Sequence, residues 1–86
     1  MREIKFSDDA EEQYNYWKKS NNEKVISRIK DLIAGIQKAP FSGIGKPEPL
    51  KNNYKGLWSR RIDKKHRLVY AVKNNVIIIV QCRFHY

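Results

Sequence analysis

The chain ends in Val76-Ile-Ile-Ile-Val-Gln-Cys-Arg-Phe-His-Tyr86, and this stretch decides its fold. It opens with five β-branched aliphatic residues, a composition typical of a strand buried on both faces. From Gln81 onward, polar and apolar residues alternate, and successive side chains of a strand point to opposite faces. Gln81, Arg83 and His85 should therefore share one face. We expect a strand that runs to the last residue, begins in the core and ends at a functional site. The alternative interpretation is a solvated strand end whose polar face only meets water.

Positive charge is concentrated in the C-terminal part of the chain. The sequence has 18 Lys and Arg against 9 Asp and Glu. Residues 1–31 carry seven of each, whereas residues 32–86 carry eleven cations and only two acids, Glu48 and Asp63. A field of this kind attracts phosphate chains, which favours a nucleic-acid or acidic partner over a merely soluble surface.

Length and residue content exclude several other classes of protein. A chain of 86 residues buries roughly 60% of its unfolded surface, which suits one domain spanning residues 1–86. The single cysteine, Cys82, permits no internal disulfide and is interpreted as a small core residue rather than a catalytic thiol. His66 and His85 lack the spacing of metal ligands, so we expect neither a metal site nor a cofactor. Without a signal segment or a membrane-length apolar run, the protein is expected to be cytoplasmic, with no membrane contact.

The N-terminal part predicts a short strand and a first helix. Residues 1–6 alternate apolar and polar side chains, as a half-buried strand does. Ser7 is a suitable N-cap for a helix over about residues 8–19, whose first turn is acidic and complements the helix dipole. The face of this helix predicted to enter the core carries Ala10, Tyr14 and Trp17.

A second helix follows and supplies most of the predicted core. It begins either at Asn22 as the cap or with Ser20 and Glu23 in a capping box. Pro40 ends it. Its apolar stripe, at spacings of three and four, comprises Val25, Ile29, Leu32, Ile33 and Ile36.

Residues 41–49, Phe-Ser-Gly-Ile-Gly-Lys-Pro-Glu-Pro, are predicted to form a loop that presents Glu48. The loop does not follow a strand, so its glycines do not indicate a phosphate-binding loop. Pro47 and Pro49 restrict the local backbone to extended conformations, which fixes the direction of the carboxylate at little entropic cost. Glu48 is therefore a candidate functional residue, although a lone loop glutamate is usually only solvated.

The C-terminal half predicts an antiparallel meander. Its strands are residues 54–62, 66–72 and 76–86. Two three-residue loops, Asp63–Lys65 and Lys73–Asn75, would join them. This register pairs Arg61 with Arg67, Arg67 with Gln81, and Val72 with Val76.

The predicted register sorts the side chains onto two faces. Four that can act on a phosphodiester converge on one face: Arg61, Arg67, Arg83 and His85. A one-residue slip would substitute Arg60 for Arg61. The face predicted to meet the helices carries Trp58, Ile62, Leu68, Tyr70, Val72, Ile78, Val80, Cys82 and Phe84. Away from the helices, an apolar patch interpreted as a partner site comprises Leu57, Val69, Ala71, Ile77 and Ile79.

An arginine cluster, a histidine and a fixed carboxylate are the groups required to cleave RNA without a metal ion. One group removes the proton of the 2′-hydroxyl, and another protonates the departing 5′-oxygen. Arginines stabilise the charge that develops on the phosphorus oxygens.

Four segments carry a resemblance to the YoeB toxins of the RelE superfamily: residues 40–51, 57–62, 66–72 and 82–86. The most specific are Gly-Lys-Pro-Glu-Pro-Leu within the first and Cys-Arg-Phe-His-Tyr in the last. The resemblance implies a microbial-ribonuclease-like α+β domain, an antiparallel twisted sheet with two N-terminal helices packed on one face. The activity it implies is ribosome-dependent cleavage of messenger RNA in the A site, with ribosomal RNA contacts. It also implies neutralisation by a YefM-like antitoxin, operator DNA binding only together with that antitoxin, and it allows a homodimer.

The same resemblance assigns roles to individual residues. Glu48 resembles the general base, Arg67 the phosphate stabiliser, His85 the general acid and Tyr86 the tyrosine that completes the site. Lys51 and Arg61 match positions that assist with phosphate, and Arg83 is expected to bind phosphate from its place in the terminal strand. Phe84 departs from the usual tyrosine.

A second hypothesis belongs to a different class. A non-catalytic basic module, which binds RNA or acts as a DNA-binding co-repressor with a partner protein, requires only the positive charge. Replacing His85 by glutamine distinguishes the two, because that change should abolish cleavage but barely alter salt-dependent RNA affinity.

Overall fold

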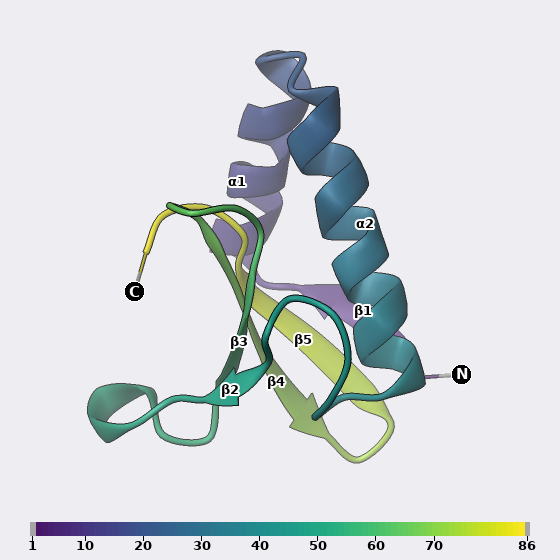
Figure 1. The fold of residues 1–86 in the computed structure, drawn as a ribbon, viewed down its shortest axis with the longest axis vertical. Coiled ribbons are helices and arrows are strands. Elements are labelled where there is room, and N and C mark those ends of the chain that lie inside the picture. Colours follow the sequence, from purple (N-terminus) through teal and green to yellow (C-terminus); the bar gives the residue numbers. More distant parts are fainter. Residues whose placement is uncertain (1, 86) are drawn as a thin grey trace.

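The computed structural model describes residues 2–85 as two helices and a five-stranded sheet. The elements are β1 (Glu3–Phe6), α1 (Asp8–Lys19), α2 (Glu23–Lys38), β2 (Glu48–Pro49), the 3₁₀ turn η1 (Asn52–Tyr54), β3 (Trp58–Arg61), β4 (Arg67–Lys73) and β5 (Val76–Gln81). The strand order is β1-β5-β4-β3-β2. β1 runs parallel to β5 and the other pairs are antiparallel, so the sheet is mixed. The predicted α+β class, with two N-terminal helices over the sheet, is confirmed (Figure 1).

Both helices begin at side-chain caps. Ser7 Oγ accepts a hydrogen bond from the Ala10 amide at 3.1 Å, and Asn22 Oδ1 accepts one from the Val25 amide at 3.2 Å. Asn22, rather than Ser20, is therefore the cap of α2. These caps set where both helices begin. α1 spans Asp8–Lys19, so the predicted first helix over about residues 8–19 is confirmed.

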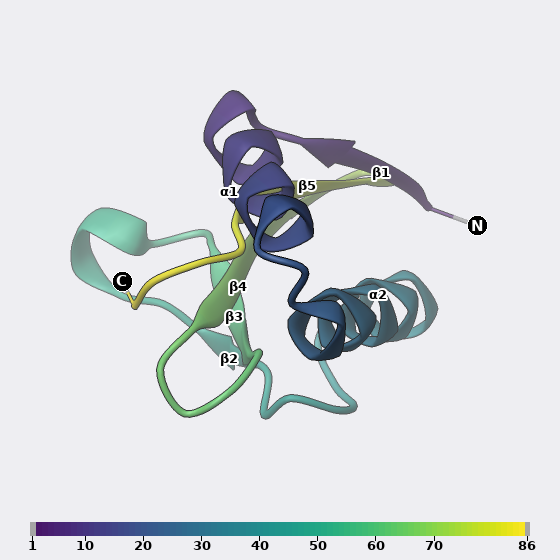
Figure 2. The same ribbon diagram turned by 90° about the horizontal axis from the view of Figure 1, so that it is seen from above.

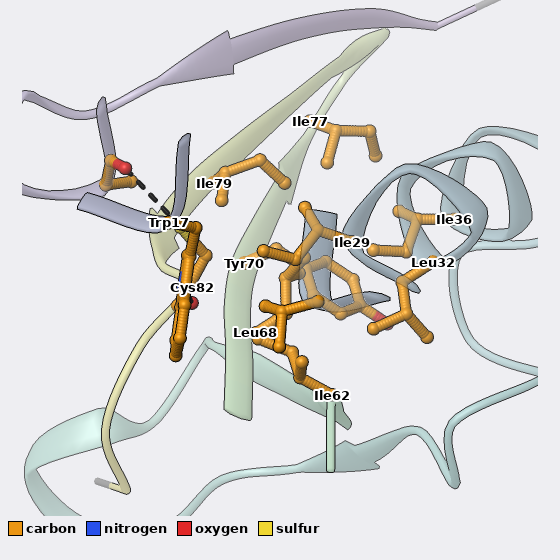
Figure 3. Packing of buried hydrophobic residues seen from close by; sticks show 12 residues of the cluster. Trp17, Ile29, Leu32, Ile36, Ile62, Leu68, Tyr70, Ile77, Ile79 and Cys82 are labelled. Carbon is orange, nitrogen blue, oxygen red and sulfur yellow. Dashed lines mark hydrogen bonds between the residues drawn. The ribbon is translucent and has the colours of Figure 1, made fainter. Parts of the chain in front are cut away.

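The core lies between the helices and one face of the sheet (Figure 3). Its buried members are Ala10, Trp17, Val25, Ile29, Leu32, Ile36, Ile62, Leu68, Tyr70, Ile77, Ile79 and Cys82. The helical stripes predicted from the sequence supply half of this set. Burial raises the pKa of the Cys82 thiol to about 12, which agrees with its interpretation as a core residue rather than a nucleophile.

The β4–β5 hairpin differs from the predicted register. Lys73 pairs with Val76, so the loop contains only Asn74 and Asn75. Asn74 adopts φ 54°, a left-handed conformation that asparagine tolerates and that tight hairpin turns require. The predicted pairing of Val72 with Val76 is therefore wrong, because Val72 faces Ile77.

This shorter turn reverses the two faces of β5. Ile77 and Ile79 are fully buried in the core, whereas Ile78 and Val80, predicted to face the helices, are only half-buried. The predicted apolar surface patch is also wrong. Val69, Ala71, Ile77 and Ile79 are all buried, and Leu57 is half-buried.

β5 ends at Gln81, so the prediction of a strand that runs to the terminus is wrong. A bulge at Val69 and Tyr70 pairs Gln81 with Val69 instead of Arg67. Beyond Gln81 the chain leaves the sheet because α1 provides other partners for its backbone. The Cys82 amide donates to Gln13 Oε1 at 2.8 Å, and the Cys82 carbonyl accepts from Trp17 Nε1 at 2.9 Å. Tyr86 lies outside the described residues.

Candidate functional site

The face of the sheet away from the helices brings three of the predicted site residues together. Glu48 on β2 pairs with Ser59 on β3, and Arg61 on β3 pairs with Arg67 on β4. Directly paired residues of antiparallel strands point to the same face, and residues two apart along a strand do so as well. Glu48, Arg61 and Arg67 therefore share one face. The predicted pairing of Arg61 with Arg67 is confirmed, and Arg60 points to the opposite side.

Arg60 supports the structure of the site, a role that the sequence did not indicate beyond a register alternative. Its side chain is fully buried, and its Nη2 donates to the carbonyls of Ala39 at 2.7 Å and Ser42 at 2.8 Å. Nη1 donates to the Ile44 carbonyl at 3.1 Å, and Nε to the Tyr70 hydroxyl at 3.1 Å. This guanidinium thus fastens the chain between α2 and β2 to the sheet. The signal was present in the adjacent Arg60-Arg61 pair, since neighbouring strand residues must face opposite sides.

The segment that leads into Glu48 is tied to the sheet at Gly45. The Gly45 carbonyl accepts a hydrogen bond from the Arg61 amide at 2.7 Å. Gly45 has φ 84°, and a Cβ there would lie 2.7 Å from Leu32 Cδ2, so a side chain at this position would be both strained and crowded. Glu48 follows three residues later and is exposed. The carboxylate is thus presented from a backbone that is fixed on both sides, by Gly45 before it and by the β2–β3 pairing itself.

Lys51 lies beside Glu48. Both line a surface hollow of about 340 Å³, together with residues of the same turn. Lys51 is exposed and precedes η1. An exposed cation and an exposed carboxylate therefore line one hollow at the β2 edge of the sheet.

Arg67 is half-buried and its guanidinium is folded over the β3–β4 turn. Nη1 donates to the carbonyls of Asp63 at 2.8 Å and His66 at 3.1 Å, with a longer contact to Lys64 at 3.4 Å. The backbone amide of Arg67 donates to the Phe84 carbonyl at 3.0 Å. Arg67 thus lies where the sheet face meets the C-terminal segment, which Figure 1 shows passing beside the β3–β4 turn.

Phe84 is held at both of its backbone polar groups. Its amide donates to His66 Nδ1 at 2.8 Å, and its carbonyl accepts from the Arg67 amide and from Gln81 Nε2 at 3.2 Å. His85 is the next residue and is exposed. The backbone of His85 therefore begins directly beside Arg67, although the strand predicted to carry it there does not form. From above, this segment and the η1 loop lie on the side of the strands away from α2 (Figure 2).

Arg83 does not share the face of Arg67, and that prediction is wrong. Its guanidinium carbon lies 3.4 Å from the centre of the Tyr16 ring on α1 and 4.4 Å from the centre of the Phe84 ring. A guanidinium close to the faces of aromatic rings gains from cation–π attraction. Because β5 has already ended, nothing constrains Arg83 to alternate with its neighbours. Its role in binding phosphate stays a prediction.

Within residues 2–85, no three His, Cys, Asp or Glu side chains are grouped as a metal site requires. No helix in the same range is long and apolar enough to cross a membrane. The grouping that does occur is two arginines and a carboxylate on one face, with a histidine following at its edge.

Comparisons with protein families, curated relatives and solved structures all point to the same family. The model of the YoeB-like toxins of bacterial type II toxin–antitoxin systems matches residues 6–86. Toxin YoeB of Streptomyces coelicolor is 51% identical over 83 residues, which covers 96% of this chain and 98% of the relative. A solved YoeB–YefM complex from Staphylococcus aureus is similar at 45% identity and a TM-score of 0.90, covering 100% of this chain and 99% of that one. A YoeB dimer from the same organism has 44% identity, a TM-score of 0.90 and coverage of 99% and 98%. The chain thus belongs to the YoeB-like toxin family of bacterial type II toxin–antitoxin systems.

Proposed function

We propose that this toxin is an endoribonuclease that cleaves messenger RNA in the ribosomal A site and thereby inhibits translation. One observation carries the proposal. Glu48, Arg61 and Arg67 share a sheet face. The segment that leads to His85 is bonded to the start of β4, where the Phe84 carbonyl accepts from the Arg67 amide. Translating ribosomes are cytoplasmic, so the proposed site of action is the cytoplasm.

In the proposed reaction, Glu48 takes the proton of the 2′-hydroxyl and the 2′-oxygen attacks phosphorus. His85 gives a proton to the departing 5′-oxygen, so the products are a 2′,3′-cyclic phosphate and a 5′-hydroxyl. Arg67 stabilises the negative charge of the transition state. The scheme needs no cofactor, because the base, the acid and the charge stabiliser are all side chains.

Other basic residues would position the RNA. Lys51 and Arg61 are exposed on either side of the proposed base and would hold flanking phosphates. Tyr86 would complete the site beyond the described residues. Arg83 would contribute at the edge of the site, from its stack against Tyr16. The formal net charge of +9 favours binding to ribosomal RNA as well.

The openness of this surface supports the proposed dependence on the ribosome. Glu48, Arg61 and His85 are all exposed, and Arg67 is bonded to carbonyls of its own turn. A site of this kind gains rate when a larger surface orients the RNA and excludes water. We therefore propose that the ribosome supplies orientation rather than a missing catalytic group.

A YefM-like antitoxin is the proposed inhibitor. The support is the YoeB–YefM complex formed by the Staphylococcus aureus relative. Operator DNA would be bound only by the toxin–antitoxin complex, and a toxin homodimer is consistent with the solved dimer of that relative.

The proposal is tested by primer extension on a translated message with wild type and His85→Gln. Wild type should produce a cleavage stop in the A-site codon, and His85→Gln should not. Lys30→Gln, which removes an exposed charge on α2, is the matched control and should cleave like wild type. RNA affinity should change little in His85→Gln. If wild type binds RNA but yields no stop, the chain is a non-catalytic basic module.

A further inference from the structure

The segment after β5 is ordered by contacts that come from distant parts of the chain. α1 holds Cys82 through Gln13 and Trp17, as described above. The β3–β4 turn holds Phe84, through the His66 ring at its amide and the Arg67 backbone at its carbonyl. Gln81 Nε2 adds a second bond to the same carbonyl, so two side chains hold the Phe84 backbone, and of these two only the His66 ring is titratable.

The His66 ring is oriented for this contact by its surroundings. The ring packs edge-to-face with Trp17, with centroids 4.9 Å apart and an interplanar angle of 84°. The His66 amide donates to Asp63 Oδ1 at 2.6 Å, which fixes the backbone of the turn. An amide N–H can donate only to an unprotonated ring nitrogen, so the bond from Phe84 requires a neutral imidazole with its proton on Nε2.

Phe84 needs to be held, because its backbone is unfavourable by itself. Its φ is 69°, in the left-handed region that a bulky residue rarely adopts. Such conformations persist only where surrounding contacts fix them, and they cluster at functional sites. The side chain of Phe84 is exposed, so apolar burial does little to fix it. The bonds at its amide and carbonyl are therefore the main restraint on the residue that precedes His85.

We propose that His66 is a positioning residue: its neutral imidazole fixes Phe84 and thereby sets His85 against Arg67, and protonation of His66 releases this arrangement. The role given to His85 rests on the proposed function, whereas the contact between His66 and Phe84 does not. His66 itself touches neither substrate nor reacting atoms in this scheme.

The groups around His66 favour its neutral form. Burial lowers the pKa of His66, and the nearby cations Lys65, Arg67 and Arg83 lower it further. Asp63 opposes them by raising it, and α1 contributes the uncharged indole of Trp17. The contact should therefore be formed at neutral pH and lost in the acid range, below the usual histidine value of 6.5.

Two variants and a control isolate this effect. His66→Ala removes the acceptor, whereas His66→Asn places an oxygen near the position of Nδ1 that cannot be protonated in this pH range. Lys64→Ala changes an exposed side chain of the same turn and is the control. The first readout is the hydrogen-exchange protection of the Phe84 amide by NMR between pH 5 and 8, which needs no RNA. The second is single-turnover cleavage on programmed ribosomes across the same range.

Wild type should protect the Phe84 amide at neutral pH and lose protection in acid, in step with the ¹⁵N shift of His66 Nδ1. His66→Asn should stay protected throughout, and His66→Ala should be unprotected throughout. Cleavage by His66→Ala should be slower by roughly ten- to a hundredfold in the maximal single-turnover rate, with the half-saturating toxin concentration little changed, as expected for a misplaced catalytic group. His66→Asn should recover most of this loss and flatten the acid limb of the pH profile.

The outcomes separate this inference from the proposed function. Equal Phe84 protection in wild type and His66→Ala overturns the inference, even if both cleave. If protection follows the expected pattern but wild type does not cleave, the contact is supported and the proposed function fails. Should His66→Ala not fold, His66→Asn decides alone: protection that falls in acid as in wild type overturns the inference.

Discussion

Arg60 and Arg61 are neighbours with different tasks. Arg60 is fully buried and donates four hydrogen bonds, three of them to carbonyls of the chain between α2 and β2 and one to the Tyr70 hydroxyl on β4. Arg61 is exposed on the proposed RNA-binding face. A strand separates them by pointing successive side chains to opposite faces. One arginine supports the architecture of the site and the next is available to substrate.

Exchanging each arginine for alanine should therefore give opposite phenotypes. Arg60→Ala leaves buried oxygens without donors, and we expect it to lower the free energy of unfolding by about 3 kcal/mol or more. Arg61→Ala should change stability by less than about 0.5 kcal/mol but reduce cleavage. Urea unfolding followed by single-turnover assays measures both quantities. Equal unfolding midpoints for the two variants would contradict the role given to Arg60.

Arg67→Ala tests the proposed charge stabiliser. The fold should persist, because the Arg67 amide still bonds the Phe84 carbonyl and the guanidinium bonds lie at the surface of the turn. The loss in transition-state stabilisation should be about 3 kcal/mol, as for removal of an oxyanion donor. Circular dichroism and cleavage rates check the two halves of this expectation. Unaltered turnover, or an unfolded variant, would be inconsistent with it.

At the scale of elements, the loop before β2 determines where Glu48 lies. Gly45 and Gly56 both have positive φ, at 84° and 94°, but their surroundings differ. A Cβ at Gly45 would clash with Leu32, whereas a Cβ at Gly56 would meet nothing within 4 Å. A substitution at Gly56 therefore reports backbone strain alone, whereas one at Gly45 reports backbone strain and packing together.

Gly45→Ala should consequently destabilise more than Gly56→Ala. Both variants place alanine in a left-handed conformation, which lowers the free energy of unfolding by about 1 kcal/mol. Gly45→Ala also overpacks the core, which lowers it by about a further 1–3 kcal/mol. Thermal unfolding of the two variants provides the comparison. If Gly56→Ala were the more destabilised, Gly45 would not be the packed position that the structure gives.

Some of these elements were accessible from the sequence and others were not. Local signals sufficed for the helices, because Ser7 and Asn22 cap them and apolar stripes mark their core faces. The length of the Asn74-Asn75 turn was not determined by local pattern, and an error of one residue there exchanged the faces of β5. The same error placed Ile77 and Ile79 in the predicted apolar patch, whereas both are buried in the core.

The C-terminal segment failed as a prediction for a different reason. Alternation in Gln81-Cys-Arg-Phe-His85 is a valid strand signal, but the partners that end the strand are Gln13 and Trp17. Contacts across 69 and 65 residues leave no local pattern. The role of His66 was missed as well, because its partner Phe84 lies 18 residues further along the chain and outside any local pattern. The predicted grouping of Glu48, Arg61 and Arg67 does not depend on this segment. It depends mainly on the Arg61–Arg67 pairing, which was predicted correctly.

For the whole molecule, titration of His66 links stability to pH. Its pKa is lowered by burial, so the unfolded chain binds the proton more readily than the folded chain. The stabilising contribution is complete above the unfolded value of 6.5 and is lost as pH falls from there through the folded pKa. The free energy of unfolding of wild type should thus decline between pH 7.5 and 5, and His66→Asn should show a smaller decline. Urea titrations at several pH values test this, and a decline of equal size in both proteins would exclude His66 as its source.

The central claim concerns Glu48 and His85 acting as base and acid on one exposed surface, and single-turnover cleavage on ribosomes with saturating toxin tests it most directly. Wild type should yield a 2′,3′-cyclic phosphate. Glu48→Gln should slow the chemical step by roughly 10² to 10⁴, the usual contribution of a general base, while binding is unchanged. A chemical step that proceeds at the wild-type rate in Glu48→Gln would contradict the account.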